Sequence, residues 1–150
     1  MSENLFDNLL HVKSLFRDRR ALSHAFNPQK LPHRRDEISA LVNNLVEALR
    51  GHAPSNMNLY GRPGSGKTAV TRFVCRDLES KGAAEGCNIS TVEINCRNID
   101  TKYRVLAEIG NRLAEEGDDM IPFTGWPSDK VFNRVRARMQ ARGGVHVIVL

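Results

Sequence analysis

The spacing of apolar residues divides the chain into alternating helical and extended segments. From Asp36 to Gly51 apolar residues recur three or four positions apart, which predicts an amphipathic helix capped by Asp36 and ended by Gly51. The same spacing predicts helices after residue 66, from a cap at Asp100 or Thr101 to about residue 113, and over about 128–142. These patterns are carried by Ile38, Leu41, Val42, Leu45, Val46 and Leu49; Val70, Phe73, Val74 and Leu78; Val105, Leu106, Ile109 and Leu113; and Val131, Phe132, Val135 and Met139.

Three segments between these helices have the composition of strands. Residues 56–60 are a short candidate, and residues 89–95 are rich in β-branched side chains. Residues 145–150 are almost continuously apolar, which is typical of a strand covered on both faces of a parallel sheet. Strands that alternate with helices predict an α/β fold of three layers, with a central parallel sheet flanked by helices. Because the most apolar strand comes last, we expect a fragment whose domain is incomplete at its C-terminal end.

Residues 1–30 show no clear period and are predicted to form a short helix followed by an extended linker. Prolines at positions 28 and 32 push the residues before them out of the helical region, so a helix through both is excluded. The N-terminal apolar residues are interrupted by charges, and no segment approaches the ~20 apolar residues of a membrane span. We therefore expect a cytoplasmic protein without a membrane partner.

The composition is basic, and its cysteine content is typical of a protein from a reducing compartment. The 150 residues include 22 Lys and Arg against 17 Asp and Glu, an excess compatible with nucleic acid or another polyanion. The three cysteines are an odd number without a C-x-x-C pair, which argues against a disulfide framework and a zinc site. The five histidines show no ligand spacing, and His146 is interpreted as a core residue of the last strand.

The segment between the first predicted strand and the following helix is rich in glycine. Gly61-Arg-Pro-Gly-Ser-Gly-Lys-Thr68 matches G-x-x-x-x-G-K-[ST] at every fixed position. Glycines let successive N–H groups point into one concavity, and the helix start adds its positive end. In such a loop Lys67 reaches the β- and γ-phosphates, and the Thr68 hydroxyl binds Mg²⁺. The predicted nucleotide-binding residues are Pro63, Gly64, Ser65, Gly66, Lys67, Thr68 and Ala69.

A row of basic residues follows one face of the last predicted helix. Its members are Lys130, Arg134, Arg138 and Arg142, with no acidic partner in the helix apart from Asp129. The row is either an ordinary solvated helix face or a surface for a phosphate backbone or another partner. The single tryptophan, Trp126, is interpreted as an anchor that fixes its loop to the core.

Several segments resemble, in the same order, the archaeal origin-recognition and cell-division-control replication initiators. They are Leu31-Pro-His-Arg34 before acids and an apolar helix, Pro54-Ser-Asn56, the glycine loop, Ile94-Asn-Cys96 and Thr124-Gly-Trp126. The resemblance covers most of residues 15–150. The loop is shared by many nucleotide-binding proteins, whereas the combination of the other segments is more specific.

The resemblance implies an AAA+ ATPase that binds ATP or ADP with Mg²⁺ and recognises double-stranded origin DNA. Residues 31–150 would be the N-terminal part of the ATP-binding domain, without the lid and winged-helix domains. Leu31, Pro32, His33 and Arg34 would lie beside the base and ribose, and the region from Asn98 to Arg142 would include the insertion that contacts DNA. Lys130, Arg134 and Arg138 are then DNA-binding candidates. The implied partners are the replicative helicase and other initiator subunits, at the nucleoid.

The resemblance also limits the expected chemistry. In the family an Asp-Glu pair that holds Mg²⁺ and orients water follows the last strand, and this chain ends at Leu150. We therefore expect no efficient ATP hydrolysis by the 150 residues alone. Two other classes remain open: a small-molecule P-loop kinase and a regulatory NTPase that does not bind DNA. Kinases commonly begin with the strand and loop, whereas here residues 1–55 precede them.

Overall fold

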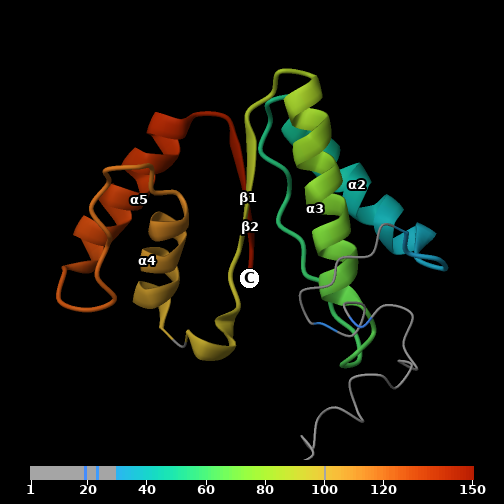
Figure 1. Cartoon of the computed structure of the whole chain (residues 1–150), viewed down its shortest axis with the longest axis horizontal. Coiled ribbons are helices and arrows are strands. Elements are labelled where there is room, and N and C mark those ends of the chain that lie inside the picture. Colours follow the sequence, from blue (N-terminus) through green and yellow to red (C-terminus); the bar gives the residue numbers. More distant parts are fainter. Residues whose placement is uncertain (1–18, 20–22, 24–29, 100) are drawn as a thin grey trace, which may run out of the picture.

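The computed structural model describes residues 19, 23, 30–99 and 101–150, so the helix and linker predicted for residues 1–30 lie almost wholly outside the described residues. Within these ranges a pair of α-helices precedes each of the two strands (Figure 1). The elements are α2 (Arg35–Leu49), α3 (Lys67–Ala84), β1 (Ile89–Glu93), the 3-10 helix η2 (Cys96–Asn98), α4 (Lys102–Arg112), α5 (Ser128–Arg142) and β2 (Val145–Val149).

The two strands form a parallel pair at the centre of the molecule. Ile89 lies opposite Val145, and Glu93 lies opposite Val149. Helices α2 and α3 cover one face of this pair and α4 and α5 cover the other, as Figure 1 shows. The predicted three-layer α/β arrangement with a central parallel sheet is therefore confirmed for this part of the fold.

Side chains alternate across the strand pair, so each face has its own apolar core. On the α2 and α3 side, Val145 and Val147 of β2 pack against the buried residues of the two helices. On the α4 and α5 side, Val92 of β1 and Ile148 of β2 join the second core. Packing on both faces explains why residues 145–150 are apolar apart from His146. The second core consists of Val92, Ile94, Ala107, Ile109, Leu113, Ile121, Val131 and Val135.

The turns into and out of the elements follow from local chemistry. The Thr101 side chain caps α4 by accepting a hydrogen bond from the Arg104 N–H at 3.3 Å, as one of the two predicted caps. Helix α5 ends at Gly143, and a Cβ at Gly144 would overlap the carbonyl of Asn88. Only glycine lets the chain pass this closely beside the start of β1.

Among the helices of the described ranges, none is both long and apolar enough to cross a lipid bilayer.

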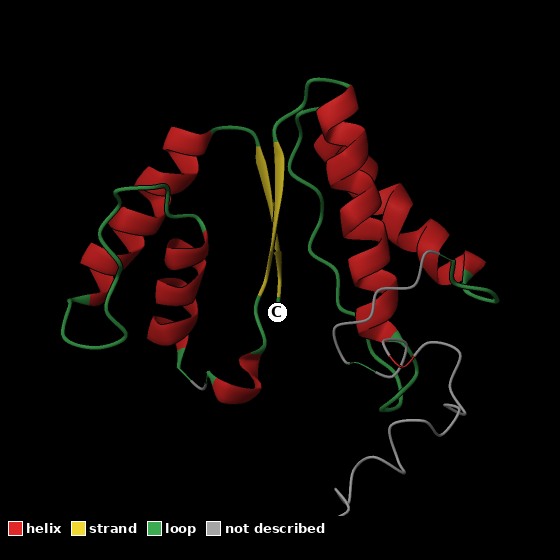
Figure 2. Cartoon of the chain, in the orientation of Figure 1, coloured by secondary structure: helices red, strands yellow, loops and turns green. Residues whose placement is uncertain are grey.

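The strand predicted for residues 56–60 is wrong. This segment is drawn as a loop in Figure 2, and in the described residues no strand pairs with it. Tyr60 is 90% exposed, and Met57 and Leu59 are 42% and 37% exposed. A strand is defined by hydrogen bonds to a neighbour, and residues 56–60 make no such backbone bonds with the described residues, so suitable composition alone does not produce one.

Three smaller predictions also need correction. Asp36 does not cap α2, because Arg34 occupies the cap position and Asp36 lies in the first turn, where its charge favours the helix dipole. Phe132 was assigned to the buried side of α5 but is 53% exposed, because the helix turns Val131 and Val135 into the core instead. The second strand ends at Glu93, two residues earlier than predicted, since η2 begins soon afterwards.

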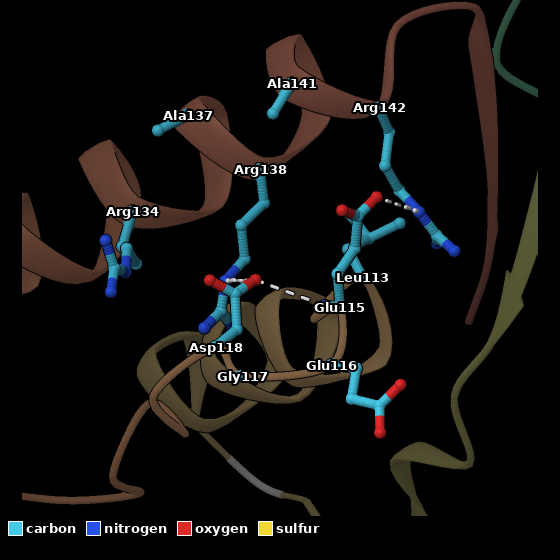
Figure 3. Close-up of a pocket in the computed structure, with 10 residues that line it drawn as sticks. All are labelled: Leu113, Glu115, Glu116, Gly117, Asp118, Arg134, Ala137, Arg138, Ala141 and Arg142. Carbon is cyan, nitrogen blue, oxygen red and sulfur yellow. Dashed lines mark hydrogen bonds and ion pairs between the residues drawn. The ribbon is translucent and has the colours of Figure 1, made fainter.

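In the basic row of α5 the three arginines face an acidic loop, which corrects for them the interpretation of an ordinary solvated face (Figure 3). Arg138 is only 5% exposed. Its Nη1 donates to the Gly110 carbonyl at 2.8 Å, its Nη2 donates to the Asp119 carbonyl at 2.5 Å, and its Nε lies 3.3 Å from the Asp118 carboxylate. Arg138 therefore joins α5 to the end of α4 and to the loop that follows.

The other two arginines of the row have looser acidic partners from the same loop. Arg134 lies 3.9 Å from Asp119, and Arg142 lies 3.8 Å from Glu115. These pairs are partly exposed, so they add little to stability. Together with Arg138 they surround a cavity of about 390 Å³ on this side of the molecule. The acidic partners that α5 itself does not provide for these arginines thus come from the loop of residues 115–119.

Replacing Arg138 with methionine is expected to destabilise the fold by about 2–4 kcal/mol, because two carbonyls lose their donor and Asp118 loses its cation. Urea unfolding followed by circular dichroism measures this change in the free energy of unfolding. Arg136→Met removes an exposed arginine of the same helix and is the matched control, with an expected change below about 0.5 kcal/mol. Equal losses for the two variants would show that the buried contacts of Arg138 do not stabilise the fold.

Candidate functional site

The glycine loop and the start of α3 form a concave backbone segment. Gly64 and Gly66 have φ angles of +76° and +86°, in the left-handed region that favours glycine. Gly66 is the cap residue of α3, so the helix begins directly after the second of these turns, as predicted. A Cβ at either glycine would meet nothing within 4 Å, which shows that backbone conformation rather than crowding requires glycine here.

The first turn of α3 presents backbone donors without internal acceptors. The first hydrogen bond of this helix runs from the Val70 N–H to the Gly66 carbonyl at 3.0 Å. Across the described residues, the N–H groups of Lys67, Thr68 and Ala69 and that of Gly66 donate to no other group. The first turn also contains no acidic residue. Free N–H groups at the positive end of a helix favour an anion.

Lys67 and Thr68 add a cation and a hydroxyl at the same place. The Lys67 ammonium donates to the Gly61 carbonyl at 3.0 Å and to the Arg62 carbonyl at 3.1 Å, so its side chain lies along the loop. Thr68 is exposed in the first turn of α3. Backbone donors, an ammonium group and a hydroxyl are the groups that a triphosphate with Mg²⁺ requires, so the residues present fit this cofactor.

The linker before α2 lies beside this loop. Leu31 is half-buried and packs on the core between α2 and α3, whereas Pro32 and His33 form an exposed turn. The Arg34 Nη2 donates to the Ser65 carbonyl at 2.9 Å, and its Nη1 donates to the Glu37 carboxylate at 2.7 Å. Arg34 thus contacts the loop itself, a contact that the sequence did not reveal.

Helix α3 is fixed to β1 by two polar contacts outside the core. Arg72 donates to the Glu93 carboxylate through Nε at 2.7 Å and through Nη2 at 2.5 Å. The Glu79 carboxylate accepts from the Thr91 N–H at 2.7 Å and from the Thr91 hydroxyl at 2.6 Å. The hydrogen bond from Arg72 lowers the pKa of Glu93, so the pair stabilises the fold above the ordinary Glu pKa and loses this effect as the pH falls.

The predicted DNA-binding residues lie on the other side of the strand pair, in α5 (Figure 1). Lys130 is exposed, and its ammonium lies 3.9 Å from the centroid of the Trp126 ring. Trp126 packs on the core between α4 and α5, and its backbone N–H donates to the Tyr103 hydroxyl at 3.2 Å, which confirms its role as a loop anchor. DNA binding by Lys130, Arg134 and Arg138 stays a prediction, and Arg138 is already bonded within the chain.

The remaining polar features do not form a second site of this kind. The cavity of about 390 Å³ is lined by residues of α5 and the 113–118 region, away from the glycine loop, and its acids and arginines face one another (Figure 3). His146 is half-buried in β2, with Nε2 3.1 Å from the Met139 carbonyl. Within the described ranges, no cluster of three or more His, Cys, Asp or Glu side chains could hold a metal ion.

Comparison with known proteins agrees with this geometry. A family model described as "AAA ATPase domain" matches residues 30–144. An ORC1-type DNA replication protein of Thermococcus onnurineus is 38% identical over 148 residues, which cover 99% of this chain and 36% of that protein. ORC1-type DNA replication protein 1 of Methanosarcina mazei is 43% identical over 148 residues, which cover 99% of this chain and 35% of that protein. The chain thus spans about a third of the length of these relatives.

Two solved structures have the same fold. The structure of the Aeropyrum pernix ORC1 protein in complex with DNA matches with a TM-score of 0.77 and 38% identity, over 88% of this chain and 34% of that chain. The structure of the Aeropyrum pernix ORC2 protein, described as ADPNP-ADP complexes, matches with a TM-score of 0.73 and 25% identity, over 91% of this chain and 35% of that chain. By its fold, its glycine loop and these matches, the chain belongs to the AAA ATPase domain family and is a relative of the ORC1-type DNA replication proteins.

Proposed function

We propose that this chain is the ATP- or ADP-binding part of a DNA replication initiator. The observation that carries the proposal is the backbone at Gly64 and Gly66, which opens the N-terminus of α3 beside the Lys67 ammonium. The ORC2 relative with bound ADPNP and ADP supports an adenine nucleotide as the ligand. The ORC1 relative in complex with DNA supports a role in replication at DNA.

Each residue of the loop has a distinct role in this proposal. The free N–H groups of residues 66–69 bind phosphate oxygens, and the Lys67 ammonium leaves the Gly61 and Arg62 carbonyls to reach the β- and γ-phosphates. Pro63 and Ser65 shape the loop between the glycines. Thr68 would hold Mg²⁺, which neutralises phosphate charge when it is bound. Leu31, Pro32 and His33 lie on the linker next to the loop and border the base and ribose.

The proposed DNA surface is the exposed part of α5. Lys130 and Arg134 lie four residues apart on one face of this helix, and both are accessible enough to contact a phosphate backbone. In the whole protein this surface would bind double-stranded origin DNA, and the nucleotide site would support loading of the replicative helicase with other initiator subunits. Such a protein would act in the cytoplasm at the nucleoid.

Lys67→Ala is expected to weaken the binding of ATP with Mg²⁺ by ~10–100-fold, because charge-assisted hydrogen bonds to the phosphates are lost. Isothermal titration calorimetry on the full chain measures this affinity. Lys81→Ala removes a lysine from the far end of the same helix, where it pairs with Glu85, and is expected to leave the affinity within about twofold. Unchanged ATP affinity in Lys67→Ala would contradict the assignment of residues 61–68 as a phosphate-binding loop. Phosphate transfer to nucleoside monophosphates would instead favour a kinase.

Changing both Lys130 and Arg134 to alanine is expected to weaken duplex DNA binding and to reduce the salt slope of log K by about 2. Fluorescence anisotropy at several salt concentrations measures both quantities. Arg50→Ala, at the end of α2 on the other side of the strand pair, is the control that should change neither. An unaltered slope in the double variant would favour a regulatory NTPase that does not bind DNA through α5.

A further inference from the structure

Arg34 forms a bridge between the start of α2 and the glycine loop. One end of its guanidinium donates to the Glu37 carboxylate at 2.7 Å, and the other donates to the Ser65 carbonyl at 2.9 Å. The side chain is 39% exposed, so it is partly shielded from water at this contact. The planar guanidinium has donors in a fixed fork, which suits two acceptors on different elements at once.

The backbone before α2 directs this side chain towards the loop. His33 has a φ angle of +59°, a left-handed conformation that is uncommon for a residue with a side chain. The next residue, Arg34, has φ −128° and ψ 25° and is the cap of α2, with its carbonyl accepting from the Ile38 N–H at 3.0 Å. The turn therefore ends at Arg34, whose guanidinium contacts the glycine loop.

The contact with Ser65 controls the direction of the neighbouring N–H group. No peptide bond in the described residues is cis, so the Ser65 carbonyl and the Gly66 N–H point to opposite sides of one rigid plane. Holding the carbonyl towards α2 therefore fixes the Gly66 N–H away from α2. That N–H donates to no other group in the part of the chain that the structure describes.

The Ser65 carbonyl does not belong to the hydrogen-bond ladder of α3. The helix begins after the left-handed Gly66, and its first ladder bond runs from the Val70 N–H to the Gly66 carbonyl. The N–H groups of the first turn therefore have no internal acceptor, as at the start of any helix. The Arg34 guanidinium supplies the donor that the Ser65 carbonyl would otherwise lack within the chain.

We propose that Arg34 is a positioning residue of the phosphate loop: by holding the Ser65 carbonyl outward, it aims the Gly66 N–H group at the polyphosphate of the nucleotide. This inference rests on the proposed nucleotide site and changes the role that the resemblance implies for Arg34. Each Nη group makes a bond within the chain, and the role assigned to Arg34 acts through the loop, without a contact to base or ribose.

Comparison of two ligands tests this role on the full chain. Mg²⁺-ATP has a base and ribose, whereas Mg²⁺-tripolyphosphate has neither. Arg34→Ala is expected to weaken both by about tenfold in calorimetry, because the loop loses a charge-assisted contact. Arg34→Lys, with a single ammonium in place of the fork, should recover part of the loss for both ligands. Arg35→Ala removes the adjacent exposed arginine and should change neither.

The Gly66 amide gives a second readout that does not depend on a ligand. Its ¹H–¹⁵N resonance in the nucleotide-free chain responds to a hydrogen bond on the Ser65 carbonyl, because the two groups share one peptide plane. Arg34→Ala should shift this resonance, and Arg35→Ala should not. Should Arg34→Ala fail to fold, Glu37→Gln releases the other end of the guanidinium and should shift the same resonance by a smaller amount.

The outcomes separate this inference from the proposed function. If the unchanged chain binds neither ligand, both the nucleotide site and the role of Arg34 are overturned. If it binds both but Arg34→Ala matches Arg35→Ala, only the positioning role is overturned. Weaker binding of ATP with unaltered binding of tripolyphosphate would also overturn it, because the arginine would then contact the base or ribose. Parallel losses for the two ligands, with a shifted Gly66 resonance, support it.

Discussion

The candidate site depends on one backbone constraint, the left-handed turns at Gly64 and Gly66 that shape the loop around the unpaired N–H groups at the start of α3. Free N–H groups at a helix start bind water or an anion, and such a start costs stability unless other contacts hold it. Here those contacts come from three directions. Lys67 folds along the loop, Arg34 holds the Ser65 carbonyl, and Arg72 with Glu79 fixes the body of α3 to β1. The loop is therefore presented in a fixed shape by the elements around it.

The parallel strand pair separates the two surfaces that the proposed function needs. The glycine loop belongs to the α2 and α3 side, and the basic row of α5 belongs to the α4 and α5 side. Strand β1 touches both, because its end carries Glu93, the partner of Arg72, and the chain then continues through η2 into α4. Under the proposed function, coupling between the nucleotide site and the DNA surface within this part of the chain would run through the end of β1 and η2, or through the two apolar cores beside the strand pair.

Local chemistry predicted the helices, the two paired strands and the loop motif, because each depends on residues close together in sequence. The structure has the roles that these residue types favour: Thr101 and Gly66 are helix caps, and α5 ends at the Gly143-Gly144 turn. The sequence failed where partners are distant. Residues 56–60 have strand composition, but a strand needs a neighbour. The contact of Arg34 with Ser65 spans 31 positions and that of Arg138 with Gly110 spans 28, and no periodicity reveals such pairs. The resemblance implies a place beside the base and ribose for Arg34 and gives no sign of its contact with Ser65.

The basic row shows why periodicity cannot assign function. Four cations at spacings of four look equivalent in sequence, yet the helix places one of them inside the fold. Arg138 donates to the Gly110 carbonyl in the last turn of α4, where helix carbonyls lack internal donors and the dipole favours a cation. Its second donor and Asp118 then hold the following loop. An apolar residue at this position would leave those carbonyls unsatisfied. One arginine of the row therefore maintains the shape of the helix pair, and this leaves Lys130, Arg134 and Arg142 as the members accessible to a polyanion.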